Sequence, residues 1–113
     1  MKTIIAGSRT ILDYSIIEKA ILESPYRITE VISGGAIGPD SFGEFWAGRN
    51  RIPIKRILPD WKTYGNSAGV IRNKEMAEES DCAIIFWDGV SKGTSNMIEN
   101  MKILGKPYIL IKV

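Results

Sequence analysis

The sequence predicts an α/β fold in which helices cover both faces of a five-stranded parallel sheet. Short β-type apolar runs alternate along the chain with stretches whose apolar residues recur at helical spacing. The run Cys82–Trp87 is continuously apolar, as expected of a strand that is buried on both faces. Glycine-rich loops follow several of the apolar runs. These three observations indicate strand–helix units joined by parallel, right-handed crossovers.

Five segments have the length and composition of short strands. They are Thr3–Ala6, Glu30–Ser33, Ile54–Leu58, Cys82–Trp87 and Tyr108–Val113. We expect these strands to lie in the order 3-2-1-4-5, as a three-layer sandwich. With this order, the topological switch point of the sheet lies between the first and fourth strands. A ligand crevice is expected there, outside the carboxyl ends of the strands.

Helical patterns fill the segments between these strands. Three of them carry an apolar stripe: Ile16, Ile17, Ala20 and Ile21; Phe42, Phe45 and Trp46; and Met97, Ile98, Met101 and Leu104. The segment Ala68–Glu79 is mostly polar and is predicted as the remaining helix. Helix boundaries are marked by Ser24-Pro25, by Pro39 near a first helical position, and by Gly105-Lys106-Pro107 after the last helix.

The composition favours one domain over residues 1–113, because 44% of the 113 residues are apolar and can form a core. The net charge is +2, and Lys and Arg are scattered among acidic residues, which argues against a nucleic-acid partner. The single cysteine, Cys82, lies in an apolar run, so we expect no disulfide and a cytoplasmic location. We see no signal peptide, and no apolar run approaches the roughly 20 residues of a membrane span, so no membrane partner is expected.

The chain contains no histidine. This excludes a Ser-His or Cys-His nucleophile pair and a histidine metal site, and one cysteine argues against zinc. We therefore expect no metal and no cofactor. Any acid–base chemistry must come from Asp, Glu, Lys, Tyr or the substrate itself.

Four glycine-rich loops predict a binding site. They are Gly7-Ser8-Arg9, Ser33–Gly38, Gly65–Gly69 and Asp88–Ser95. Most stand between an apolar run and a helical stretch, which places them at one edge of the sheet, where helix N-termini direct free N–H groups at a ligand. Glycine allows the backbone to approach a phosphate closely. We expect a nucleotide or another phosphate- or ribose-bearing small molecule at this edge.

The second of these loops is a candidate phosphate or ribose cradle. Its candidate residues are Ser33, Gly34, Gly35, Ala36, Gly38 and Asp40. The alternative is an ordinary turn in which Asp40 favours the dipole of the following helix. The loop is not a Walker loop, because no Gly-Lys-Ser/Thr follows, and its glycine spacing differs from the dinucleotide fingerprint.

Two arginines are candidate phosphate ligands, each beside further candidate residues. Arg9 follows Gly7 and Ser8 directly after the first strand, and Arg72 precedes Asn73 near the start of a helix. A guanidinium can bind phosphate through two parallel hydrogen bonds. The alternatives are a surface arginine that closes a turn and a solvated helix face.

The segment after the fourth strand supplies an acid and hydroxyl groups. Asp88 is a candidate for ribose hydroxyls, and Thr94 and Ser95 are candidates for phosphate, with Ser91 and Gly93 as further ligand-binding candidates. A turn acid with a plain N-cap explains the same residues. Trp61 and Tyr64 lie in the predicted loop Pro59–Ser67, where they could stack on a base or pack over the edge of the sheet. Glu99, on the last helix, is either a candidate acid or a solvated residue.

Taken together, these motifs resemble the SLOG superfamily, and within it the YspA-like, YpsA-related branch. The matching segments are Ala6–Arg9, Ser33–Ala36 with Gly38 and Asp40, Asp60-Trp61, Gly69 with Arg72-Asn73 and Met76, and Trp87–Gly89 with Ser91 and Gly93-Thr94. They follow in order over nearly the whole chain. The resemblance implies a Rossmann-like fold that binds nucleotides or nucleotide-derived ligands.

A more distant similarity links the chain to the Lonely Guy phosphoribohydrolases, which cleave the N-glycosidic bond of nucleoside monophosphates. Their Arg-Lys-x-x-Met motif is similar to Arg72–Met76, and their Gly-Gly-x-Gly-Thr-x-x-Glu motif is similar to the segment that ends Gly93–Met97. The glutamate of that family falls on Met97 here. Glu99 lies two residues on, about 200° around a helix, and does not simply replace it.

Three functions are consistent with these patterns. The first is a module that binds a nucleotide-derived signal, such as an ADP-ribose species or a cyclic nucleotide, as a sensor or a sponge. The second is an N-glycosidase or phosphoribohydrolase, for which Asp88, Glu99 and Asp40 are the candidate carboxylates. The third is an interaction domain whose glycine loops are only tight turns. Homodimerisation is a further expectation, drawn from the relatives.

Overall fold

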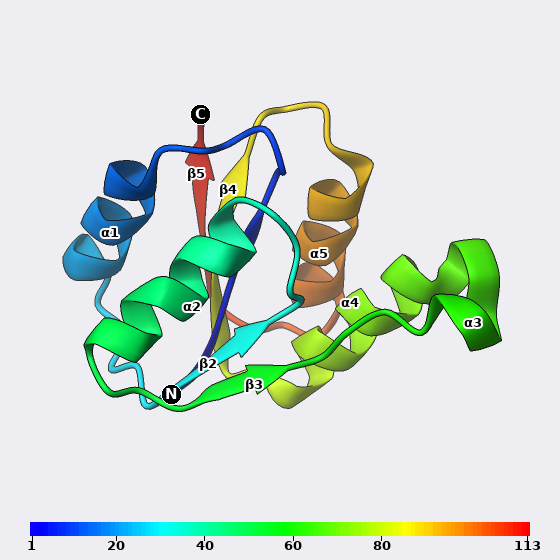
Figure 1. Cartoon of the computed structure of the whole chain (residues 1–113), viewed down its shortest axis with the longest axis horizontal. Coiled ribbons are helices and arrows are strands. Elements are labelled where there is room, and N and C mark those ends of the chain that lie inside the picture. Colours follow the sequence, from blue (N-terminus) through cyan, green and yellow to red (C-terminus); the bar gives the residue numbers. More distant parts are fainter.

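The chain forms one parallel sheet with the predicted strand order (Figure 1). The computed structural model describes all residues, Met1–Val113. The strands are β1 (Lys2–Gly7), β2 (Glu30–Ser33), β3 (Ile54–Arg56), β4 (Cys82–Trp87) and β5 (Tyr108–Lys112). They are hydrogen-bonded in the order β3-β2-β1-β4-β5, and each neighbouring pair is parallel. The predicted α/β class and order 3-2-1-4-5 are confirmed.

Four longer helices occupy the predicted segments. They are α1 (Tyr14–Glu23), α2 (Pro39–Arg49), α4 (Ala68–Glu79) and α5 (Lys92–Ile103). None of them combines the length and the apolar character that a bilayer-crossing helix needs. The segment predicted as a loop over 59–67 instead contains a one-turn helix, α3 (Trp61–Tyr64), and a 3₁₀ turn, η1 (Gly65–Ser67). The carboxylate of Asp60 begins α3, because it accepts the amide of Thr63 at 3.1 Å.

The third strand is shorter than predicted. It ends at Arg56 rather than Leu58, although the amide of Ile57 still bonds to the carbonyl of Ser33 at 2.9 Å. Pro59 has no amide hydrogen and cannot continue a strand ladder, so the chain leaves the sheet before it. The segment Leu58–Asp60 consequently runs along the carboxyl end of the sheet toward α3.

Alternate residues of the central strands feed two separate cores, one on each face of the sheet. One core joins the strands to α1 and α2 through Ile5, Ile11, Ile17, Ala20, Ile21, Val31, Trp46, Ala47, Ile84 and Phe86. The other joins them to α4 and α5 through Ile4, Ala6, Ile32, Ile57, Met76, Ala77, Ala83, Ile85, Met97, Ile98 and Met101. The connecting helices therefore change from one face of the sheet to the other between β3 and β4. Loops from both faces consequently meet at the carboxyl ends of β1 and β4.

The helix α2 lies unusually close to β1. A Cβ atom at Gly43 would stand 2.7 Å from the Cβ of Ile5, a distance that packed carbon atoms do not tolerate. The absence of a side chain at Gly43 thus sets the depth at which α2 packs on the sheet. It also sets the position of Asp40, one turn earlier on the same helix.

This packing gives a testable contrast between two glycines of α2. We expect Gly43→Ala to destabilise the protein, although alanine favours helices over glycine by about 1 kcal/mol. The new Cβ would meet the rigid Cβ of Ile5, whereas a Cβ at Gly48 meets nothing within 4 Å. Gly48→Ala should therefore raise the free energy of unfolding by up to about 1 kcal/mol. Urea unfolding of both variants checks this, and equal stabilisation by the two would contradict it.

Candidate functional site

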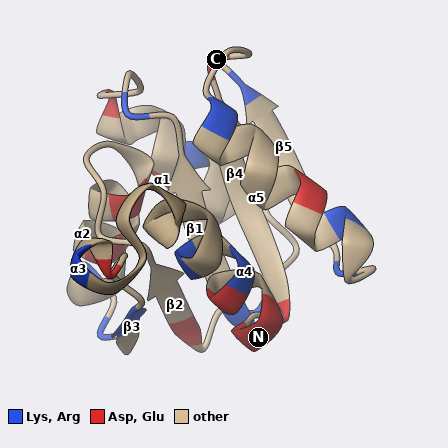
Figure 2. Cartoon of the chain, turned by 90° about the vertical axis from the view of Figure 1, so that its right-hand side faces the viewer, with Lys and Arg blue, Asp and Glu red and all other residues tan.

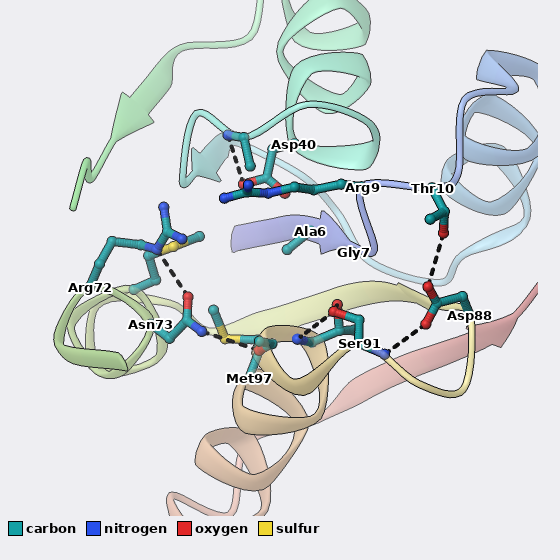
Figure 3. A pocket seen from close by; sticks show the side chains of 14 residues that line it. Ala6, Gly7, Arg9, Thr10, Asp40, Arg72, Asn73, Asp88, Ser91 and Met97 are labelled. Atoms are coloured by element: carbon teal, nitrogen blue, oxygen red, sulfur yellow. Dashed lines mark hydrogen bonds between the residues drawn. The ribbon is translucent and has the colours of Figure 1, made fainter. Parts of the chain in front are cut away.

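A cavity of about 340 Å³ opens at the carboxyl ends of β1 and β4, where the crevice was expected (Figure 3). Its lining combines most of the predicted loop residues with apolar residues of β1, α4 and α5. The residues are Ala6, Gly7, Arg9, Thr10, Ala36, Asp40, Arg72, Asn73, Met76, Asp88, Ser91, Gly93, Thr94 and Met97. The fold therefore brings the candidates from residues 7–9, 33–40, 72–73 and 88–94 to one place. The third predicted loop, Gly65–Gly69, does not line this cavity, because its residues form η1 and the start of α4.

Several candidates do not line this cavity. Gly34 and Gly35 line an adjoining space, whereas Ser8, Ser33 and Gly38 hold the loops of the site. The buried hydroxyl of Ser8 accepts the amide of Asp88 at 3.1 Å and lies 3.3 Å from the hydroxyl of Thr94. The hydroxyl of Ser33 donates to Glu44 at 2.7 Å and accepts the amide of Gly35 at 3.1 Å. Gly38 has a φ of 89°, and a Cβ there would meet the carbonyl of Ile11. These residues support the site without facing a ligand.

Arg72 and Asp40 meet across the backbone of Gly34. The Nη1 of Arg72 donates to the carbonyl of Gly34 at 2.6 Å, and a carboxylate oxygen of Asp40 accepts the amide of Gly34 at 3.1 Å. A Cβ at Gly34 would lie 2.6 Å from Nη1 of Arg72 and 2.8 Å from Oδ2 of Asp40. Only glycine at position 34 therefore allows Arg72 and Asp40 to form their hydrogen bonds with this turn at the same time.

Asp40 is a buried acid at the wall of the cavity, with an exposed fraction of 5%. Burial raises its pKa to about 6, and Arg72 and the amides of Ala36, Gly34 and Gly7 counteract this shift. Burial also lowers the pKa of Arg72, which Asp40 opposes and the like charge of Arg9 reinforces. A guanidinium nevertheless stays protonated in proteins. Asp40 therefore titrates close to neutral pH beside a permanent cation.

Arg9 differs from Arg72 because it forms no hydrogen bond or ion pair with the protein. Its side chain extends over the cavity in Figure 3. The predicted alternative, a turn closed with Asp13, does not occur, since the carboxylate of Asp13 instead accepts from Ser15. All five N–H donors of Arg9 are consequently available to a ligand.

Asn73 joins the helix that carries Arg72 to the helix on the opposite wall. Its side-chain amide donates to the carbonyl of Gly93 at 3.2 Å and to Asn96 at 3.1 Å, and its oxygen accepts from Nε of Arg72 at 3.0 Å. The residue is nearly buried, so these bonds are protected from water. Asn73 thus fixes the direction in which the Arg72 guanidinium points.

At the opposite end of the cavity, Asp88 organises the start of α5. One carboxylate oxygen accepts the amides of Val90 and Ser91 at 2.9 and 2.8 Å, and the other accepts from the hydroxyl of Thr10 at 2.9 Å. These bonds, those from the backbone first, lower the pKa of Asp88 to about 2. Asp88 is therefore ionised at every physiological pH.

The first turn of α5 presents free backbone amides. The hydroxyl of Ser91 caps the helix by accepting the amide of Thr94. The amides of Lys92 and Gly93 have no acceptor within the protein. Free amides at the start of a twelve-residue helix favour a bound anion.

The cavity floor is apolar. Ala6, Met76 and Met97 are buried and line it, and Met97 occupies the position at which the phosphoribohydrolase motif has a glutamate. Glu99 is exposed and lies outside the cavity lining. The carboxylates that face this cavity are therefore Asp40 and Asp88.

Sequence reasoning did not identify Thr10 or the floor residue Ala6 as parts of the site. Ala6 could have been found from strand alternation, because it lies at the end of β1 on the face that α4 and α5 cover. Thr10 carries no local signal, since its role depends on Asp88, a residue 78 positions away. Figure 2 shows Lys and Arg interspersed with Asp and Glu over the side of the molecule that faces the viewer.

The titration of Asp40 predicts how stability changes with pH. Its pKa of about 6 exceeds the ordinary aspartate value of 3.8, so the folded state binds more protons than the unfolded state between these values. The contribution of Asp40 to the free energy of unfolding therefore falls as pH rises from 4 to 6. From pH 7 to pH 5 we expect a gain of about 1 kcal/mol in the wild type. Urea unfolding of Asp40→Asn should show this gain removed, and an unchanged pH dependence would contradict the assignment.

Comparison with known proteins shows the family of the chain. Residues 1–64 match the model of the YAcAr family, described as the YspA, cpYpsA-related SLOG family. The matched part includes Arg9 and Asp40. The chain is also 32% identical over 118 residues to the Gene 61 protein of Mycobacterium phage D29, which covers 96% of this chain and 94% of the phage protein. No solved structure matches the chain. The resemblance inferred from the motifs is thereby confirmed, and the chain belongs to the YspA, cpYpsA-related SLOG family.

Proposed function

We propose that the protein binds a nucleotide or a nucleotide-derived small molecule in this cavity and holds it intact, as a sensor or a sequestering module. Membership of the SLOG family supports a nucleotide-related role, either binding or processing. The observation that carries the proposal is the pair of guanidiniums, Arg9 and Arg72, on one wall of a polar cavity. Arg9 has no partner in the protein, and Arg72 uses only Nε and Nη1.

The charge around the arginines favours an anion. Two guanidiniums face one buried carboxyl there, that of Asp40, whose pKa of about 6 leaves it partly protonated near neutral pH. The negative charge of Asp88 lies at the other end, where two amides and a hydroxyl already compensate it. A phosphate placed between the arginines and the free amide of Gly93, which lines the cavity, would receive donors from both sides.

The same cavity has acceptors for a sugar. A carboxylate offers about four lone-pair sites, and Asp88 uses three of them within the protein. One acceptor position therefore remains for a ribose hydroxyl. Thr94 and Ser91 add hydroxyl groups on the same wall. A ligand that carries both ribose and phosphate satisfies more of these groups than inorganic phosphate does.

Hydrolysis of the N-glycosidic bond is the second candidate function. One observation favours it: Asp40 and Asp88 line one cavity, and their pKa values are shifted in opposite directions, to about 6 and about 2. Such separation is typical of an acid and its partner carboxylate in glycoside-cleaving sites. Against it, both carboxylates are occupied by backbone amides, and the apolar Met97 takes the glutamate position of the Lonely Guy motif. We therefore rank intact binding first.

Arginine substitutions test the binding proposal. With AMP and ADP-ribose as probes, we expect calorimetry to detect binding to the wild type. Arg9→Gln should weaken it by about tenfold or more, because a hydrogen bond to a charged group contributes about 1.5–3 kcal/mol. Since the side chain of Arg9 forms no hydrogen bond or ion pair within the protein, its loss should leave the unfolding midpoint unchanged. Arg27→Gln, at an exposed arginine outside the cavity, is the matched control.

The outcome that contradicts this proposal is equal affinity of the wild type and Arg9→Gln for both probes. Absence of binding to the wild type would also overturn it for these ligands.

Mass spectrometry separates binding from cleavage. We expect AMP incubated with the wild type to be recovered intact from the protein, with no free base. If adenine and ribose 5-phosphate formed in proportion to enzyme and time, the hydrolase function would replace our first choice. Asp40→Asn and Asp88→Asn would then identify the acid. The carboxylate required for hydrolysis is the one whose substitution stops turnover but leaves AMP binding intact.

A further inference from the structure

A second cavity of about 310 Å³ adjoins the first. It is lined by Arg9, Gly34, Gly35, Ala36, Leu58, Pro59, Trp61 and Arg72. Arg9, Ala36 and Arg72 line both cavities. The two spaces therefore meet at the guanidinium pair, and a ligand whose phosphate lies there can extend into both.

The walls of the second cavity differ from those of the first. One wall is apolar and comes from Leu58 and Pro59, which follow β3, and from Trp61, the first residue of α3. Leu58 is 61% exposed and Trp61 is 55% exposed. The other wall is the backbone of Gly34–Ala36. Exposed apolar side chains that are grouped beside a cavity mark a ligand or partner site more often than isolated ones do. This space therefore suits a flat apolar group that lies next to the guanidinium pair.

We infer that the second cavity takes the base of the nucleotide, stacked on the indole of Trp61. This inference rests on the proposed function and extends it to the part of the ligand that the first cavity does not explain. Every nucleobase has a π face, and stacking on an aromatic side chain contributes about 1–3 kcal/mol per base. The planar guanidiniums of Arg9 and Arg72 border the same space and can also stack.

Trp61 is held in position for this role. The carboxylate of Asp60 caps α3, and a Cβ at Gly69 would lie 3.8 Å from Cη2 of Trp61, so the indole rests near the start of α4. Tyr64 is on the same short helix and is 50% exposed, but it lines neither cavity. The chain thus contains two exposed aromatic residues three positions apart, of which one faces the cavity.

This pair gives the experiment. AMP and its base-free counterpart, ribose 5-phosphate, are titrated by calorimetry against the wild type, Trp61→Ala, Trp61→Phe and the control Tyr64→Ala. We expect Trp61→Ala to weaken AMP binding by about fivefold to a hundredfold, the range that stacking energies imply. Ribose 5-phosphate binding should be unchanged in every variant. Trp61→Phe should retain part of the AMP affinity, and Tyr64→Ala all of it.

The possible failures are distinct. If the wild type binds neither compound, the proposed function fails and this inference fails with it. If the wild type binds both but Trp61→Ala leaves AMP affinity unchanged, Trp61 only covers the start of α4, and the base site is wrong while the proposed function stands. An equal loss of AMP and ribose 5-phosphate binding in Trp61→Ala would show disruption of the loop rather than stacking, and would also overturn the base site.

Discussion

The contact of the Arg72 guanidinium with the Gly34 carbonyl is the interaction on which the site depends. It joins α4, on one face of the sheet, to the loop between β2 and α2, which belongs to the other face. The carboxylate of Asp40 accepts a hydrogen bond from the amide of Gly34 in the same turn. A cation and an acid therefore meet across one residue without a side chain. Because Asp40 is buried and Arg72 is half-buried, the attraction between their charges is stronger than it would be in a surface pair.

The two acids of the cavity are best understood through what they already bind. Asp40 accepts amides of the β2–α2 loop, and Asp88 accepts amides of the β4–α5 loop. Each carboxylate satisfies backbone donors that would otherwise lack partners, which is why both loops keep a defined shape. The arginines, in contrast, retain unused donors. The free donors are thus concentrated on the arginines, and most acceptor positions of the two carboxylates are occupied.

Much of the fold was predictable, because its signals are local. The alternation of Ile4, Ile5 and Ala6 assigns successive residues of β1 to opposite faces, and the continuous run Cys82–Trp87 indicates a central strand. The boundaries of α4 are those predicted, Ala68–Glu79. The prediction was wrong after β3, where Pro59 ends the ladder and a capped helical turn replaces the expected loop. That helical turn, α3, carries Trp61, the residue that we propose to stack on the nucleobase.

The sequence by itself determined the order of strands and helices, the glycine loops at one edge of the sheet, and the absence of histidine chemistry. Only the tertiary structure decided which loop residues face a ligand. Ser8 and Ser33 turn inward to hold loops, whereas Arg9 remains free. The second cavity, with Leu58 and Trp61, was also decided there. The physical reason is that strand and helix periods set side-chain direction locally. In loops, direction depends on partners far along the chain, such as Asp88 for Ser8.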